Sequence, residues 1–259
     1  MAKKLKDYYD LDCVKLLAEK ICVVRCDMDQ IGFTTYLSQE LEDKEFYGRQ
    51  DAFVAAFDKY LGSNYAGNIR TFEQILGPEL INPEGMFKIG WWLWPIGRYV
   101  ERFGLQDFEV SIGFIYELTK RFTGEFAIRP LIAEYPVGAL QTMLKWSQDS
   151  NVHVRRLSSE GLRISLPWAK KSLAAIKTTE DFETYKHILT NLKNDPAKFV
   201  QKSVGNNLND LIKVRPDLAL QIIQEWQVDN PSKETLWIIK HGLRSQKLSL
   251  KISNQQLTS

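Results

Sequence analysis

Residues 155–163 gather arginines and one glutamate at a spacing that suits a single face of a helix. At about 100° per residue, one half of the circumference carries Arg155, Ser159, Arg163, Arg156 and Glu160. Two interpretations stay open. The face is a solvated surface with an Arg156–Glu160 pair one turn apart, a contact of about 0.3–0.5 kcal/mol. Alternatively, it is a cationic site with one working carboxylate.

The charge along the chain favours a polyanion-binding role for the C-terminal half. The whole sequence has a formal net charge of only +2. Residues 1–60 and 61–128 are acidic, at −3 and −2, whereas residues 129–259 carry 19 basic and 12 acidic side chains, or +7. Such asymmetry is typical of a surface that binds a polyanion, although the overall balance is less basic than in dedicated nucleic-acid proteins.

Helices must position these residues. Apolar residues recur at helical spacing in four segments, at 11–21, 110–118, 140–144 and 218–226, and alternating strand-like runs are nearly absent. Turn-forming residues at 62–64, 149–151, 194–196 and 229–231 separate segments that suit helices and helix pairs. The sequence therefore predicts an all-α fold.

A self-comparison indicates repeats. Residues 149–162 align with residues 195–208, which places Val154 on Val200, Arg156 on Lys202 and Leu162 on Leu208. A fainter copy follows at 230–241. A period of roughly 40–47 residues is that of HEAT or armadillo repeats, which stack into a concave surface. We expect a short HEAT-like solenoid with a concave basic face, with residues 1–90 as an N-terminal helical cap and residues 91–259 as the repeats of one continuous domain.

Composition excludes several classes of protein. The 259 residues are 44% apolar and 25% charged, as in a soluble globular protein. The cysteines Cys13, Cys22 and Cys26 lack partners for a zinc site and are expected to be reduced. The start of the chain lacks a signal-peptide pattern and no run is long enough to span a bilayer, so we expect a cytoplasmic protein. Phosphate-loop, zinc-protease, serine-hydrolase and zinc-deaminase motifs are absent, and no cofactor or metal is expected.

Four stretches resemble the AlkC family of DNA alkylation-repair glycosylases. They are WPIGRYVERFG (94–104), TKRFTGEFAIRP (119–130), HVRRLSSEGLRISLPW (153–168) and SVGNNLND (203–210), in the family's order and spacing. The resemblance runs from about residue 90 to 245. It implies a monomeric HEAT-like repeat protein that binds duplex DNA and removes bases with a small cationic alkyl lesion. N3-methyladenine is the first expected substrate, with N3-methylcytosine and N1-methyladenine as further candidates. The resemblance also implies that the damaged base is not fully flipped out, unlike in most glycosylases.

The sequence departs from the family at two places. Many members continue after Gly161 with Ser-Arg-Pro-Arg, whereas this chain has Leu162, Arg163, Ile164 and Ser165, so Arg163 supplies the cation alone. Some members carry an immunoglobulin-like domain after the repeats. This sequence resembles the shorter form without it.

The resemblance assigns the acidic site residues Glu125 and Glu160, with Asp210 as a third candidate. The alternatives are a helix-terminal carboxylate for Glu125 and a cap within a repeat for Asp210. A cationic base leaves without being protonated, so an ionised carboxylate need only stabilise the sugar cation and hold a water. No lysine nucleophile is required, which predicts a monofunctional glycosylase without strand cleavage. Trp168 is expected to lie against the cationic lesion, although most tryptophans pack in the core.

Phosphate contacts are expected from basic and amide side chains that recur once per repeat, each of which alone would be an ordinary solvated group. They are Arg129, His153, Arg155, Arg156, Arg163, Lys170, Lys171, Lys202, Asn206, Asn207, Lys240 and Arg244. Two hypotheses compete with the enzyme: a repeat scaffold that binds DNA structure or a protein without catalysis, and a basic adaptor that binds peptides independently of salt.

Overall fold

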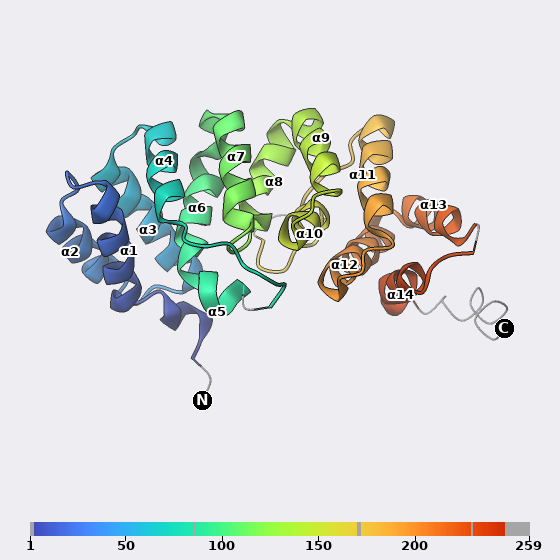
Figure 1. Cartoon of the computed structure of the whole chain (residues 1–259), viewed down its shortest axis with the longest axis horizontal. Helices are drawn as coiled ribbons and strands as arrows, with labels where there is room; N and C mark the ends of the chain where they lie inside the picture. Colours follow the sequence, from blue (N-terminus) through green and yellow to red (C-terminus); the bar gives the residue numbers. More distant parts are fainter. Residues whose placement is uncertain (1–2, 85, 170–171, 229, 247–259) are drawn as a thin grey trace. The chain divides into compact units, whose positions relative to one another are not determined.

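The computed structural model describes residues 3–84, 86–169, 172–228 and 230–246. Throughout these ranges the regular structure consists of α-helices and short 3-10 helices, without a strand, which confirms the predicted all-α class (Figure 1). No helix in the described ranges is both long and apolar enough to cross a membrane. The chain divides into two compact units, Met1–Glu134 and Tyr135–Ser259. Residue 91, where we expected the repeats to begin, lies inside the first unit.

The first unit is built from helices that pack in two series. One series consists of α1, α4 and α7, and the other contains α3, α6 and α8, with α2 packed against both α1 and α3. The helices are α1 (Leu11–Val24), α2 (Gln30–Glu40), α3 (Phe46–Leu61), α4 (Tyr65–Ile75), α5 (Met86–Gly90), α6 (Trp94–Phe103), α7 (Phe108–Thr119) and α8 (Glu125–Glu134), with the 3-10 turns η1 (Leu5–Tyr8), η2 (Trp91–Leu93) and η3 (Gly104–Gln106).

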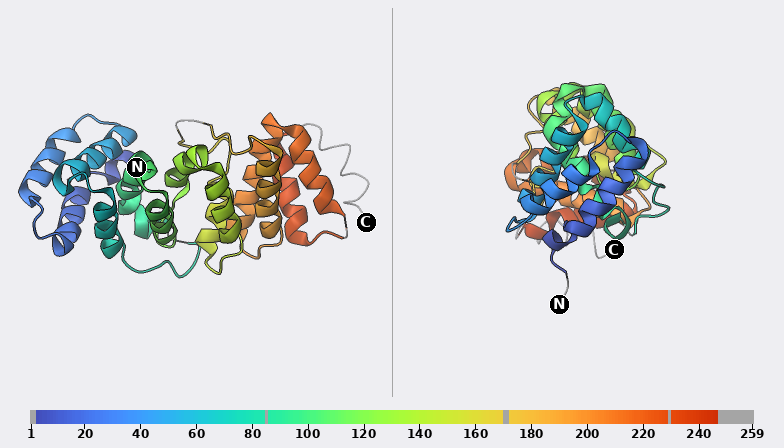
Figure 2. Two further views of the ribbon diagram at one scale, coloured as in Figure 1. Left: turned by 90° about the horizontal axis from the view of Figure 1, so that it is seen from above. Right: turned by 90° about the vertical axis from the view of Figure 1, so that its left-hand side faces the viewer.

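The second unit consists of helix pairs. In it, α12 packs against both α10 and α14, while α9 packs against α11. Trp226 and Glu225 of α13 bond to Thr190 and Lys186 of α11. Helices α12 and α14, coloured orange and red, lie side by side in Figure 2. The helices are α9 (Pro136–Trp146), α10 (Val152–Glu160), α11 (Thr179–Leu192), α12 (Lys198–Val214), α13 (Pro216–Gln227), α14 (Lys233–Gly242) and the 3-10 turn η4 (Leu243–Ser245).

The sequence repeat is visible in the turns that precede α10 and α12. Asp149 Oδ1 accepts a hydrogen bond from the amide of Asn151 at 2.7 Å, and Asp195 Oδ1 accepts one from the amide of Ala197 at 2.8 Å. Val154 and Val200 occupy equivalent buried positions in the two helices. The same turn chemistry and the same buried position therefore recur in both copies.

The two copies differ where the chain leaves the helix. α12 continues to Val214, whereas α10 ends at Glu160, and residues 161–169 and 172–178, before α11 begins at Thr179, form no regular helix. The helical periodicity placed Arg163 on the face of one continuous helix. That prediction is wrong, because Arg163 lies beyond the end of α10 and is free of the helical register. Its side chain can therefore extend toward α12.

Candidate active site

Glu160 is the last residue of α10 and its side chain is buried. Asn151 caps the start of this helix, where its Oδ1 accepts hydrogen bonds from the amides of His153 and Val154. Ser159 and Glu160 are 0% and 5% exposed. The interpretation of this face as a solvated surface is therefore wrong: the polar face turns toward α12, not toward water.

Three side chains bind the Glu160 carboxylate. Ser203 Oγ donates to Oε2 at 2.6 Å, Arg163 Nη1 donates to Oε1 at 2.8 Å, and Arg156 Nη2 lies 3.5 Å from Oε1. Burial opposes ionisation of this carboxyl, but the charges of the two arginines and the hydrogen bonds outweigh it. The pKa of Glu160 is therefore held below its usual range, and the group is an anion at neutral pH.

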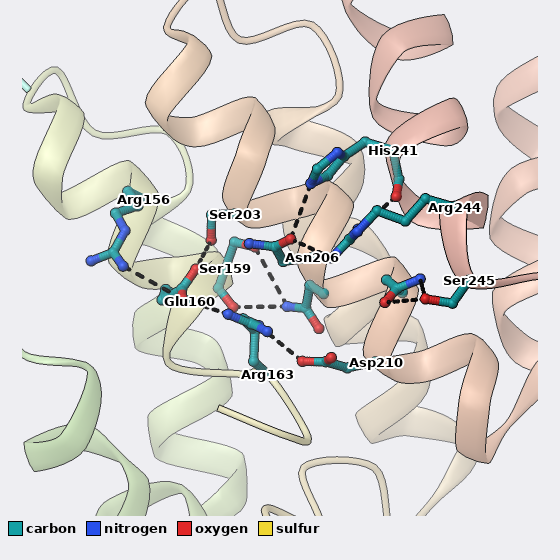
Figure 3. A network of polar contacts seen from close by, with 12 residues as sticks. Arg156, Ser159, Glu160, Arg163, Ser203, Asn206, Asp210, His241, Arg244 and Ser245 are labelled. Carbon is teal, nitrogen blue, oxygen red and sulfur yellow. Dashed lines mark hydrogen bonds and ion pairs between the residues drawn. The ribbon is translucent and has the colours of Figure 1, made fainter. Parts of the chain in front are cut away.

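Arg163 connects Glu160 to a second buried carboxylate. Its Nε donates to Asp210 Oδ2 at 2.9 Å while Nη1 bonds to Glu160, so one guanidinium holds both acidic side chains (Figure 3). Arg163 and Asp210 are 7% and 5% exposed. Ionised partners make these hydrogen bonds stronger than neutral ones, and the planar fork of arginine fixes their geometry.

One face of α12 supplies the other side of this network. Ser203, Asn207 and Asp210 recur at spacings of four and three, which aligns them on a helix. Asn207 Nδ2 donates to the carbonyl of Ser159 at 2.7 Å, and its Oδ1 accepts from the Tyr185 hydroxyl at 2.5 Å. These bonds join α10, α11 and α12 around the carboxylates. Both ends of the buried Asn207 amide are therefore bonded within the protein.

Next to the acidic groups, α12, α14 and η4 present a cationic surface. Asn206 Oδ1 accepts from Arg244 Nη2 at 2.8 Å and contacts His241 Nε2 at 3.1 Å (Figure 3). Lys202, Lys240 and Arg244 are exposed. These three cations have the accessibility that a phosphate contact requires.

The other predicted contacts of α10 are engaged within the protein. Arg155 donates to Asp195 Oδ2 at 2.6 Å and to the carbonyls of Asp149 and Ser150, which joins the two repeats. The guanidinium of Arg156 lies 5.0 Å from the centre of the Phe199 ring. His153 is buried, with its ring edge-on to Phe199 at 5.5 Å.

Trp168 lies on the irregular segment after α10. Its side chain is 59% exposed, and its backbone has a φ of 69°, in the left-handed region that a bulky residue seldom adopts. Trp168 is therefore not a core residue, and its indole is accessible to a bound ligand. Lys170 and Lys171, which follow it, lie outside the described residues.

Glu125 and Arg129 belong to the first unit. Glu125 begins α8, as expected, and accepts a hydrogen bond from Thr123 Oγ1. Arg129 follows one turn later, and both side chains are buried.

Sequence reasoning missed Ser203, Tyr185 and His241. Ser203 stands seven residues before Asp210, a helical spacing that signals a shared face. Tyr185 and His241 reach the site through packing between helices, for which no local pattern exists.

In fold and site, the chain is a helical-repeat protein with a buried acid–arginine network beside exposed cations. Residues 125–250 match the model of the family described as DNA alkylation repair enzyme. The curated protein YhaZ of Bacillus subtilis (strain 168), described as uncharacterized, is 42% identical over 147 residues. The solved structure of the Pseudomonas fluorescens alkylpurine DNA glycosylase AlkC, bound to DNA containing an abasic site analog, matches with a TM-score of 0.80 at 30% identity.

These matches confirm the predicted resemblance to AlkC and to DNA alkylation repair enzymes, and they confirm the helical-repeat class. The AlkC match covers 95% of this chain and 65% of the AlkC chain. The YhaZ match covers 57% of this chain and 40% of YhaZ. The chain thus spans less than two thirds of either relative.

Proposed function

We propose that this chain is a DNA glycosylase that hydrolyses the N-glycosidic bond of cationic alkylated bases in duplex DNA, with N3-methyladenine as the first substrate. The observation that carries the proposal is the buried guanidinium of Arg163, which donates to both Glu160 and Asp210 and holds two carboxylates in one place. The family match and the alkylpurine DNA glycosylase AlkC support the same chemistry.

The substrate's own charge explains why carboxylates suffice. When the C1′–N bond of an N3-alkylated adenine breaks, the bonding electrons neutralise the base, so no acid has to protonate the leaving group. Positive charge then develops on the deoxyribose, and water adds to C1′ and loses a proton. Fixed negative charge stabilises such a transition state because it does not have to reorganise during the reaction. Sugar hydrolases differ, since one of their two carboxyls must be protonated.

The hydrogen bonds assign different roles to the two carboxylates. Glu160 is bound by Ser203, Arg163 and Arg156, which suits a fixed anion. Within the described ranges, the Asp210 side chain accepts a hydrogen bond from Arg163 alone. Asp210 therefore retains more capacity to accept a hydrogen bond from the attacking water, and we assign it that role.

Trp168 supplies selectivity for the charged lesion in this proposal. A cationic base against an indole face gains about 0.5–2 kcal/mol that a neutral base does not. The exposure of Trp168 supports this assignment. The exposed cations Lys202, Lys240 and Arg244 contact phosphates of the DNA backbone and do not distinguish between base sequences. Arg155 and Arg163 instead hold the protein's own carboxylates.

Glu125 keeps its proposed role as a carboxylate of the reaction. Its burial and its place at the start of α8 are compatible with this role and equally with a structural one. Base release by Glu125→Gln therefore tests it separately from the network around Glu160.

The experiment is release of free base from methylated duplex DNA. Wild-type protein should release N3-methyladenine and leave the strand at the abasic site uncut, because the proposed mechanism has no lysine nucleophile. Permanganate reactivity of the thymine opposite the lesion should stay low in the complex if the damaged base is not fully flipped. DNA binding without base release would reject the enzyme in favour of the non-catalytic scaffold.

A further inference from the structure

Two glycines bring α12 and α14 together at one point. A β-carbon on Gly205 would lie 2.7 Å from His241 Cδ2, and one on Gly242 would lie 2.9 Å from Leu208 Cβ. Because such distances are too short for real contacts, only glycine permits this approach. The imidazole of His241 is therefore held against the backbone of α12.

The hydrogen bonds of Asn206 fix the tautomer of His241. Arg244 Nη2 lies 2.8 Å from Asn206 Oδ1, and arginine can only donate, so this atom is the amide oxygen. The same oxygen lies 3.1 Å from His241 Nε2, which must then carry a hydrogen and donate. A second proton would go to Nδ1 and leave the bond to Asn206 in place. The imidazole is thus arranged to become a cation without rearrangement.

All the charges that act on His241 in the described part of the chain are positive. They come from Lys198 and Lys202 of α12 and from Arg244 of η4. Burial, followed by these cations, lowers the pKa of His241 below its usual range. On its own helix the ring stacks on Trp237 with centroids 4.8 Å apart, and Lys198 Nζ lies over the same indole. Glu234 of α14 acts on Lys198.

We propose that Lys198, Lys202, His241 and Arg244 form a site for one backbone phosphate of duplex DNA, at which His241 takes up a proton as the phosphate binds. An anion at this position attracts each of the cations, and this attraction offsets the repulsion among them. The site rests on the proposed function for the identity of its ligand. Figure 3 places His241 and Arg244 beside Asn206, which lies one turn along α12 from Ser203 on one side and from Asp210 on the other.

The sign of the pH dependence follows from linkage. In the free protein His241 is neutral at pH 7, and a bound phosphate raises its pKa. Binding therefore takes up a proton, and affinity for DNA rises as the pH falls through the pKa of the complex, until the free protein is also protonated. A rise of one pKa unit corresponds to about a tenfold gain in affinity.

The test measures binding of the full chain to undamaged duplex DNA over a range of salt concentrations, at pH 5.5 and at pH 8. His241→Gln is compared with the matched control His187→Gln, since His187 is exposed on α11 of the same unit. For wild type and for the control, the slope of log affinity against log salt should steepen by up to about 0.9 at pH 5.5, because protonated His241 adds one cation at the phosphate. The slope of His241→Gln should not change with pH.

Because His241 lies in the close contact between α12 and α14, His241→Gln could fold poorly, and a second variant away from that contact tests the site independently. Lys202 is exposed, so Lys202→Gln should fold normally and should bind DNA with a slope shallower by about 0.9 at both pH values. A pH-dependent slope retained in His241→Gln would overturn the proton uptake, and an unchanged slope in Lys202→Gln would overturn the phosphate site. Either result leaves base release, and so the proposed function, standing. Failure of the wild-type protein to bind DNA would contradict both the phosphate site and the proposed function.

Discussion

Arg163 Nε lies 2.9 Å from Asp210 Oδ2, although the two residues are 47 positions apart in the sequence. The same guanidinium donates to Glu160 from its Nη1 atom. Without this cation, two buried carboxylates would share a site with only Arg156 to balance them, and like charges at short range raise the pKa of at least one carboxyl. Arg163 thus positions the two acidic residues and also favours the ionised form of Glu160.

Replacing Arg163 should change how base release depends on pH. In the wild type the pKa of Glu160 lies below its usual value of 4.5, so this group is predominantly ionised between pH 5 and 8 and imposes no steep decline there. Arg163→Gln raises this pKa, and the rate should fall toward pH 5. At pH 7 the rate should drop by about 10- to 100-fold, because a hydrogen bond to a charged group contributes about 1.5–3 kcal/mol.

Single-turnover release of N3-methyladenine from pH 5 to 8, corrected for spontaneous loss, measures this effect. Arg163→Lys keeps the charge but not the fork, so it should retain the flat profile at a reduced rate. A flat profile in Arg163→Gln would contradict the positioning role. The same linkage applies to stability: the contribution of ionised Glu160 is present above pH 4.5 and is lost as the pH falls through its lower folded pKa.

The contact between Arg155 and Asp195 should matter for stability and not for chemistry. Asp195 accepts from Arg155 Nε at 2.6 Å and from the amide of Ala197 at 2.8 Å. Asp195→Ala removes a buried partner and a turn-forming bond, so the free energy of unfolding should fall by about 2 kcal/mol. Urea denaturation measures it. Asp217→Ala breaks an exposed pair with Arg215 and is the matched control, with no measurable change expected. Equal effects would refute the structural role of Arg155.

Trp168 should affect the damaged base more than the DNA backbone. Trp168→Ala should slow release of N3-methyladenine by about 2- to 30-fold, the equivalent of the cation–π gain, and leave the affinity for undamaged duplex unchanged. Trp168→Phe keeps an aromatic face, so its rate of N3-methyladenine release should lie between the rates of wild type and Trp168→Ala. An equal loss of affinity for undamaged DNA would show that Trp168 contacts the DNA in general and not the lesion.

Local pattern was enough for the helices and for the turns between them. The periodic segments became α1, α7, α9 and α13, and Asp149 and Asp195 begin equivalent turns 46 residues apart. Helical spacing also placed Arg156 one turn from Glu160, where the two side chains pair at 3.5 Å. Such features depend on residues close in sequence, for which helix geometry is a sufficient guide.

The acid–arginine network could not be predicted in the same way. The periodicity extends α10 through Arg163, but the helix stops at Glu160, and the direction of the next side chain depends on tertiary contacts. The burial of Glu160 and the bond from Ser203 require α12 to pack on α10 in one register. The spacing of residues along the sequence does not determine how two helices align when they pack.

The most direct test of the account is single-turnover release of N3-methyladenine from methylated duplex DNA by wild type, Asp210→Asn and the matched control Asp217→Asn, whose site on α13 is exposed. The account predicts release by wild type and by the control at equal rates. Asp210→Asn should be slower by about 10²- to 10⁴-fold, as expected for loss of a group that activates water, with unchanged affinity for undamaged duplex. Release by Asp210→Asn at the wild-type rate would contradict it.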